Sequence, residues 1–221
     1  SCIDSDGKIA MVPNSPCPVL WGFRGTEDSI LIDNFHNLGP EKPVRWLLYR
    51  TNQATDDHLR SKEILNVKEG DCIRVEVAVS SVPETIEGGH RFFSVKDSFG
   101  EMIKCAAFEP SKDFRHIIDK LEVGDKLIVC GSVNNDTLNL EKIKILDLVT
   151  RYSKPPNPIC ECGKRTHSSG KNSYYRCKAC GKKYSRPELI AFESELELGW
   201  YEPPASSRRH LSTPASMMLK L

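Results

Sequence analysis

Apolar and polar residues alternate most regularly in the stretch 72–80. Isoleucine or valine occupies every second position from Ile73 to Val79, and Arg74 and Glu76 lie between them. A period of two is typical of a β-strand that buries one face. The pattern therefore predicts a strand at 72–80.

Comparable apolar runs predict further strands at 90–95, 102–108, 126–132 and 137–148. A helix is expected between the third and fourth strands. Pro110 and Ser111 open it, and its apolar positions fall on one face: Phe114, Ile117, Ile118 and Leu121. Three strands, a helix and two strands follow the order of an OB-fold, a five-stranded Greek-key barrel. Another small β-domain is the alternative that the pattern leaves open.

The last of these strands changes its phase. Leu138 and Leu140 share one parity, whereas Ile143 and Ile145 take the other. A slip of one residue inside a strand predicts a β-bulge, which barrels use to curve.

The first 60 residues predict a different kind of unit. A short strand is expected at 18–23, then a helix that Thr26 caps and Gly39-Pro40 ends, then a second strand at 44–49. Strand–helix–strand is one half of a ferredoxin-like α+β unit. Because so small a sheet leaves an edge unpaired, we expect the other half to lie upstream, and the start at Ser1 agrees.

The segment 50–59, Arg-Thr-Asn-Gln-Ala-Thr-Asp-Asp-His-Leu, holds a dense set of hydrogen-bonding groups. One interpretation is a capped helix start, with Asn52 or Thr55 as the N-cap. That interpretation leaves Arg50, Gln53 and His58 unassigned. A functional polar cluster is the other interpretation, and the residues alone leave both open.

Cysteine spacing predicts a metal site behind the proline-rich linker 153–158. Cys160 and Cys162, then Cys177 and Cys180, form two pairs, and each pair is followed by glycine. This arrangement is typical of a Cys₄ zinc ribbon, in which the metal is structural because no coordination position stays open. Unliganded thiols are the alternative. The other five of the nine cysteines are scattered singly, which favours a reducing, cytoplasmic setting.

Charge is distributed unevenly over the 221 residues. The net charge is +1, but residues 151–186 hold ten Lys and Arg against one acidic residue. Tyr174, Tyr175 and Tyr184 lie among these cations. Charge for phosphates and exposed rings for stacking on bases together predict a nucleic-acid-binding surface, although a charged run is often only a solvated face. No apolar run reaches the roughly 18 residues of a membrane-spanning helix, so we expect no membrane partner.

Eight stretches over nearly the whole chain carry a resemblance to a known family: 18–25, 50–59, 88–90, 106–110, 138–142, the four-cysteine segment, 201–204 and 208–211. They are similar to the archaeal tRNA-isoleucine 2-agmatinylcytidine synthetase family. The stretches 50–53 and 208–211 are the most specific. Ala54 stands where that family commonly has glycine.

The resemblance implies a tRNA-modifying ligase. Together with the patterns described above, it gives α+β/all-β multidomain as the expected fold class. Such an enzyme uses ATP and Mg²⁺ to activate C2 of the wobble cytidine of an isoleucine tRNA, and agmatine displaces the activated oxygen. This chain looks like the rear of that enzyme, and the sequence has no Gly-rich phosphate loop. We therefore expect ATP and agmatine to be bound by an absent N-terminal domain, and this chain alone to be inactive.

The expected domains are a partial ferredoxin-like unit at 1–65, the OB-fold at 66–150, the zinc ribbon at 151–186 and a C-terminal extension at 187–221 that packs on or near the ribbon and barrel. The catalytic residues stay unassigned. The candidates for tRNA binding or for the vicinity of the site are Arg24, Arg50, Asn52, Gln53, Asp56, His58, His90, Lys164, Arg165, Lys171, Tyr174, Tyr175, Arg176, Lys182, Lys183, Arg208, Arg209 and His210. Two other functions remain: a stand-alone binder of single-stranded nucleic acid, and a protein–protein adaptor.

Overall fold

The computed structural model describes residues 24–37, 45–170 and 174–218. The chain divides into two compact units. One comprises Ser1–Asp147 together with Leu198–Leu221, and the other comprises Leu148–Glu197. No helix in the described ranges has the length and apolar character that crossing a membrane requires.

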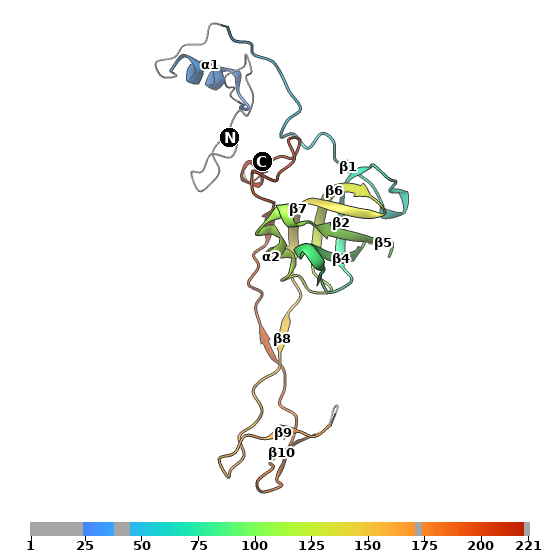
Figure 1. The fold of residues 1–221 in the computed structure, drawn as a ribbon, viewed down its shortest axis with the longest axis vertical. Helices are drawn as coiled ribbons and strands as arrows, with labels where there is room; N and C mark the ends of the chain where they lie inside the picture. The colour runs from blue at the N-terminus through green and yellow to red at the C-terminus, as the bar shows by residue number, and fades with distance from the viewer. Residues whose placement is uncertain (1–23, 38–44, 171–173, 219–221) are drawn as a thin grey trace. The chain divides into compact units, whose positions relative to one another are not determined.

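The first unit is built on a closed barrel of five strands (Figure 1). These strands are β2 (Cys72–Val79), β4 (Arg91–Lys96), β5 (Met102–Ala107), β6 (Lys126–Asn134) and β7 (Thr137–Asp147). Their order around the barrel is β2-β6-β7-β5-β4, and pairing of β2 with β4 closes the ring. Only the β5–β7 pair among them is parallel. This is the connectivity of an OB-fold, so the predicted fold class is confirmed.

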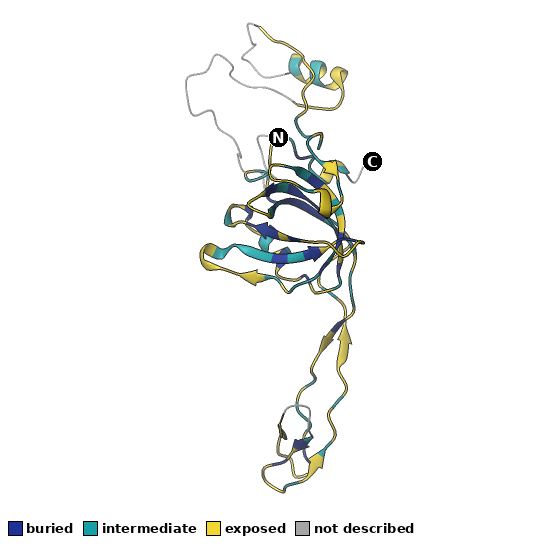
Figure 2. Cartoon of the chain, turned by 90° about the vertical axis from the view of Figure 1, so that its right-hand side faces the viewer, coloured by how far each residue is buried: buried dark blue, intermediate teal, exposed yellow. Residues whose placement is uncertain are grey.

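Buried residues recur along these strands, where Figure 2 colours the ribbon dark blue, and their side chains form the core of the barrel. Ile73, Val79, Val95, Leu127 and Ile143 are among those with no exposed surface. This burial follows the period of two in the sequence, because successive side chains of a strand point to opposite faces. The apolar interior is therefore the main source of the barrel's stability.

Three short strands extend the barrel. β1 (Arg60–Ser61) lies beside β2, β3 (Glu84–Thr85) beside β4, and β13 (Gly199–Tyr201) beside β7. The region between the strands predicted at 72–80 and 90–95 has regular structure of its own. It contains β3 and a 3₁₀ turn, Glu87–Gly89.

The predicted helix after Pro110 is shorter than expected. It consists of a 3₁₀ turn at Glu109–Ser111 and the helix α2 (Phe114–Ile118). Lys112 interrupts them, because its φ of 50° lies in the left-handed region and cannot continue a right-handed helix. Phe114 and Ile118 are nevertheless buried as the pattern predicted.

The bulge lies where the sequence changes phase. Lys142 is opposite Cys130, and Leu140 is opposite Gly131, so Glu141 has no partner on β6. At this point the two backbones come very close. A Cβ atom added to Gly131 would lie 2.1 Å from the carbonyl oxygen of Asn139.

Less of the predicted N-terminal unit is described. The helix α1 (Asp28–His36) is present, but Glu27 occupies the N-cap position in place of Thr26, and its side chain makes no capping bond. The predicted strand 18–23 and the stop at Gly39-Pro40 lie outside the described residues. Residues 45–49, the described part of the strand predicted at 44–49, form no strand. A strand needs a hydrogen-bonded neighbour, and none lies beside them in the described ranges.

The second unit contains two small sheets. β8 (Arg151–Ser153) pairs with β12 (Ile190–Phe192). The other sheet has the order β11-β10-β9, from Lys183–Tyr184, Tyr175–Arg176 and His167–Ser168. The first part of the predicted C-terminal extension thus supplies a strand.

We predict that Gly131→Ala destabilises the barrel by at least about 2 kcal/mol, because the new methyl group meets backbone that cannot rotate away. Gly100→Ala is the matched control. Its Cβ meets no atom within 4 Å, and it suffers only the strain of a positive φ, about 1 kcal/mol. Urea unfolding of both variants measures the difference. Equal stability of the two would show that β6 and β7 do not approach so closely.

Candidate metal centre and nucleic-acid interface

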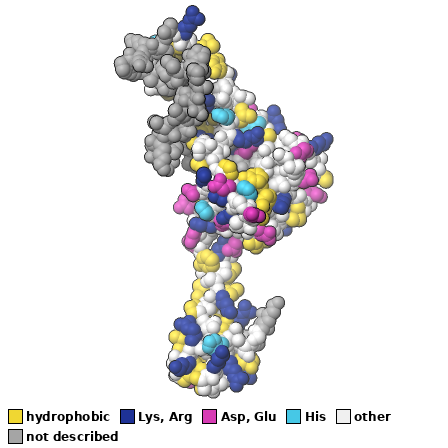
Figure 3. Space-filling model, in the orientation of Figure 1, with side chains coloured by type: hydrophobic (Ala, Val, Ile, Leu, Met, Phe, Trp, Pro, Cys, Tyr) yellow, Lys and Arg dark blue, Asp and Glu magenta, His cyan; other side chains and the backbone are white. Residues whose placement is uncertain are grey.

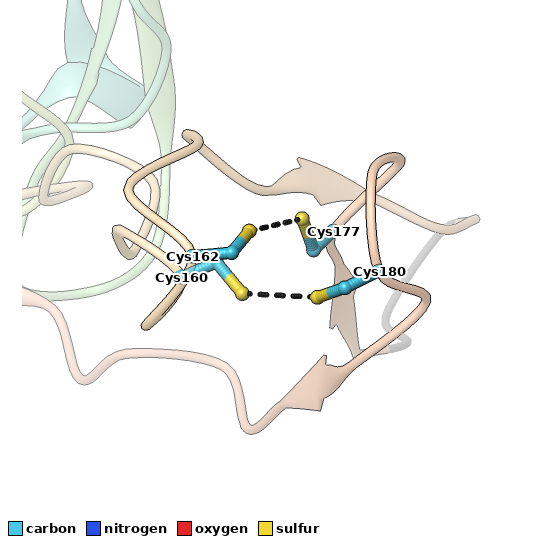
Figure 4. Close-up of side chains that lie close together, drawn as sticks. All are labelled: Cys160, Cys162, Cys177 and Cys180. Atoms are coloured by element: carbon cyan, nitrogen blue, oxygen red, sulfur yellow. Dashed lines mark hydrogen bonds between the residues drawn. The ribbon is translucent and has the colours of Figure 1, made fainter.

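The four clustered cysteines meet in the second unit (Figure 4). Their Sγ atoms all lie within 4.8 Å of one another. The Sγ of Cys160 is 3.3 Å from that of Cys180, and the Sγ of Cys162 is 3.5 Å from that of Cys177. Tetrahedral zinc with Zn–S bonds of about 2.3 Å separates its sulfur atoms by about 3.8 Å. The donor set therefore fits one zinc ion and leaves no position for a substrate.

Two tight turns bring these sulfur atoms together. Gly163 and Gly181 each follow a cysteine pair, with φ of 79° and 77°, a region that glycine enters without strain. The Gly163 amide donates to the Cys160 carbonyl at 2.7 Å, and the Gly181 amide to the Cys177 carbonyl at 2.9 Å. The glycine that follows each cysteine pair in the sequence thus allows the tight turn that positions that pair.

Tyr184 supports the same centre from β11. Its hydroxyl donates to the Sγ of Cys160 at 3.2 Å. This hydrogen bond, together with weaker ones from the Cys162 amide and the neighbouring thiols, lowers the pKa of Cys160 to about 6. A thiolate is the form that binds metal, so the tyrosine favours the ligand state of this cysteine. The sequence placed Tyr184 among the aromatic residues for RNA, and the structure gives it a role at the metal centre.

Cations cover the surface of this unit. Figure 3 shows dark-blue Lys and Arg side chains gathered on its visible face, whereas the barrel carries both signs. We define the cationic ribbon surface as six of the exposed cations: Lys164, Arg165, Arg176, Lys178, Lys182 and Lys183. Lys182 forms an ion pair with Glu161 at 2.6 Å, so part of its charge is already compensated. Lys171 lies outside the described residues.

The tyrosines of this unit differ in how far they are exposed. Tyr175 is only 2% exposed, so the expectation that it is available for stacking on bases is wrong. Tyr175 lies on β10, where adjacent residues face opposite sides. Its side chain is buried in the small core of this unit, whereas its neighbour on the strand, Arg176, is exposed. Tyr174 is half-exposed, with the Lys183 ammonium 4.5 Å from its ring centre.

In the first unit, the polar loop (50–59) is not a helix start. Its residues form turns, and Ala54 and Asp56 have φ of 58° and 60°. Left-handed backbone at two positions excludes the capped helix that the sequence allowed. The loop instead pairs with residues 208–213, which we call the C-terminal strap. The amides of Ala54 and Asp56 donate to the carbonyls of His210 and Leu211, each at 2.9 Å.

Charged groups of β7 fix both segments. The Lys142 ammonium lies 2.7 Å from both carboxylate oxygens of Asp56. The Glu141 carboxylate accepts from Arg209 at 2.6 Å and lies 2.8 Å from the His58 Nε2 atom. Asp56, His58 and Arg209, which were candidates for RNA contact, are thus engaged within the protein.

The remaining candidates differ in exposure. His90 accepts from the Glu109 amide at 3.0 Å through Nδ1, and Arg208 pairs with Glu202 at 3.0 Å. Both are therefore held internally. The exposed candidates of the first unit are Arg24, Arg50, Asn52 and His210. Gln53 is half-exposed.

Sequence reasoning missed the two residues that organise this region, Glu141 and Lys142. A signal was present, because both charges interrupt the apolar alternation at the phase change. Polar residues inside an otherwise buried strand are informative, since burying a charge is costly unless it is paired. Trp200 and Thr213 were also missed, and neither carries such a signal.

These features define the class of the chain: an OB-fold barrel joined to a four-cysteine zinc ribbon. A family model described as the TiaS FLD domain matches residues 2–58, and one described as the TiaS C-terminal zinc ribbon domain matches residues 157–196. The chain thus carries two domains of the TiaS family, and the family resemblance is confirmed.

Relatives named as the 2-agmatinylcytidine synthetase TiaS of an isoleucine tRNA match nearly the whole chain. That of Methanocaldococcus jannaschii is 43% identical over 216 residues, which cover 96% of this chain and 50% of the relative. That of Archaeoglobus fulgidus is 42% identical over 212 residues, covering 95% and 50%. The chain spans about half the length of these relatives.

Solved structures agree with this match. The complex of TiaS with its isoleucine tRNA and ATP superimposes with a TM-score of 0.78 at 40% identity, over 96% of this chain and 50% of that one. The complex of TiaS with the same tRNA, AMPCPP and agmatine gives 0.73 at 38% identity, over 96% and 50%.

We predict one zinc ion per chain. Because metal binding and folding of such ribbons are coupled, removing zinc with a chelator should unfold the second unit and leave the barrel intact. Metal analysis and amide exchange of the two units measure this. Cys177→Ser should reproduce the effect, whereas Cys72→Ser, outside the cluster, should retain the metal. Much less than one zinc in freshly purified protein would contradict the prediction.

We predict that Ala54→Gly stabilises the first unit by about 0.5–1 kcal/mol, because glycine adopts the left-handed backbone of this position without strain. Ala78→Gly, within β2, is the matched control and should destabilise by a similar amount through lost chain entropy. Chemical denaturation compares the two. A loss of stability in both variants would argue against the left-handed turn.

Proposed function

We propose that this chain is the tRNA-binding half of an ATP-dependent ligase that attaches agmatine to C2 of the wobble cytidine of an isoleucine tRNA. ATP, Mg²⁺ and agmatine would be bound chiefly by the other half of the whole protein, and the reaction would take place in the cytoplasm. None of the seven described cysteines forms a disulfide, in agreement with a reducing compartment.

One observation carries the proposal: 96% of this chain superimposes on a protein whose structure was solved with an isoleucine tRNA and ATP. A likeness of this extent, at 40% identity, concerns the barrel, the ribbon and the segments between them together. A shared barrel alone would not support an activity, because OB-folds host many functions.

The charge distribution supports RNA as the partner. The cationic ribbon surface combines six exposed Lys and Arg side chains with the half-exposed ring of Tyr174. Cations neutralise phosphates and release their counterions, and an accessible ring stacks on an unpaired base. A stand-alone binder of single-stranded RNA would use the same surface, so activity has to discriminate the two functions.

The test of the proposal is agmatine transfer. The whole protein, incubated with labelled agmatine, ATP and an isoleucine tRNA whose wobble base is cytidine, should label the tRNA only when ATP is present. The same tRNA with uridine at that position is the control and should stay unlabelled. RNA binding without any transfer by the whole protein would favour the stand-alone binder.

The ribbon should also determine the salt dependence of tRNA binding. Replacing Lys164, Arg165, Lys182 and Lys183 by alanine should flatten the slope of log K against log salt by about 3, because each phosphate contact contributes about 0.7–0.9. Lys96, Lys112, Lys120 and Lys126, exposed on the barrel, provide a control of equal charge change. Filter binding at several salt concentrations measures both slopes. A larger change in the barrel variant would assign the phosphate contacts to the barrel.

A further inference from the structure

The β-bulge places two opposite charges, Glu141 and Lys142, on the side of β7 that carries the polar loop and the C-terminal strap. We propose that they are positioning residues. They hold both the loop and the strap on the barrel, and thereby orient the side chains of Arg50, Asn52 and Gln53 for the modification reaction. For its activity this inference rests on the proposed function, whereas the geometry stands without it.

We call Glu141 and Lys142 together the clamp, and Lys142 supplies its first half. Its side chain has no exposed surface, and its ammonium binds both carboxylate oxygens of Asp56 at 2.7 Å and the Thr213 carbonyl at 2.8 Å. The ring of Trp200 lies 5.8 Å from the ammonium. A buried ammonium is tolerated only where opposite charge and acceptors surround it. Lys142 therefore requires the loop, through Asp56, and the strap, through Thr213, to be in place together.

Glu141 supplies the second half. Its side chain is 4% exposed, and its two oxygens bind different segments: one lies 2.8 Å from the Nε2 atom of His58 in the loop, and the other accepts from Arg209 of the strap at 2.6 Å. In a regular strand, neighbouring side chains point to opposite faces. The bulge removes this alternation at Glu141, so that both charges reach the same two segments.

The loop and the strap also bind one another directly. Besides the two backbone bonds from Ala54 and Asp56, the Thr213 amide donates to the Asp56 carboxylate at 2.7 Å, and its hydroxyl to the Ala54 carbonyl at 3.0 Å. The bonds enclose the two left-handed residues of the loop. A strained backbone persists only where its surroundings determine it, and such sites are concentrated where geometry serves function.

The loop residues that precede Ala54 are available to contact a substrate. Within the described residues, the side chains of Arg50, Asn52 and Gln53 make no hydrogen bond or ion pair, and Arg50 and Asn52 are exposed. Asp56 and His58 are fixed only a few residues further along. The clamp therefore limits how far the three polar side chains can move without occupying any of their donors or acceptors.

The test compares Lys142→Met and Glu141→Gln with Lys126→Met in the whole protein. Lys126 pairs with Asp147 at 3.5 Å on the same barrel, and both side chains are more than half exposed, so its loss is a matched control. The clamp variants should exchange the amides of 54, 56 and 213 at least tenfold faster, while β4 and β5 stay protected. The kcat of agmatine transfer should fall at least tenfold, with the KM for tRNA changed by less than about threefold. The control should match the parent in each measurement.

A double variant, Lys142→Met with Asp56→Asn, separates positioning from stability. Removing both charges should recover much of the melting temperature lost in the single variant, because no unpaired charge is left buried. It should not recover kcat, since the bond that fixes the loop is still missing. Recovery of kcat together with the melting temperature, or unchanged exchange in the single variants, would overturn the inference. If the parent protein itself transfers no agmatine, the proposed function fails, and exchange alone decides the clamp.

Discussion

The extra residue Glu141 in β7 determines how the polar loop and the C-terminal strap are held on the barrel. The bulge at Glu141 lets the strand curve around the barrel and brings its backbone against β6, at a position where only glycine fits. It also directs an acid and a base to the same side of the strand. Each of these charges needs a partner, because desolvation of an unpaired charge costs several kcal/mol. The polar loop and the C-terminal strap supply the partners, and so two segments far apart in sequence are fixed at one site.

The two units reach stability by different physical means. The barrel buries a continuous set of aliphatic side chains, whereas the ribbon has little to bury beyond Tyr175, Leu196 and two of its cysteines. A unit of this size with so small a core would depend on a metal, which would replace apolar burial by coordination. Four thiolates around one zinc ion would carry a net charge of −2, which nearby cations would offset. A metal centre would thus be compatible with the cationic surface of the ribbon.

The sequence predicted the features that depend on local pattern. Strand alternation, the phase change at Leu140 and the cysteine spacing led to the barrel, the bulge and the metal centre. The polar loop could not be predicted, because its conformation is set by hydrogen bonds to His210 and Leu211, more than 150 residues further along. The burial of Tyr175 was within reach. Tyr174 and Tyr175 are adjacent, and where a strand buries one face, only one of two neighbours can face the solvent.

The candidate residues of the first unit fall into two groups, and the division constrains how they can serve a reaction. Asp56, His58, His90, Arg208 and Arg209 are bound to other groups of the protein, so an RNA contact by any of them would compete with an internal bond or share the group that makes it. Arg50, Asn52 and His210 are exposed and would lose only water. A contact that costs no internal bond gains more free energy on binding. The polar loop therefore combines two roles. The buried charges that bind it fix its position on the barrel, and its exposed side chains are available to contact RNA.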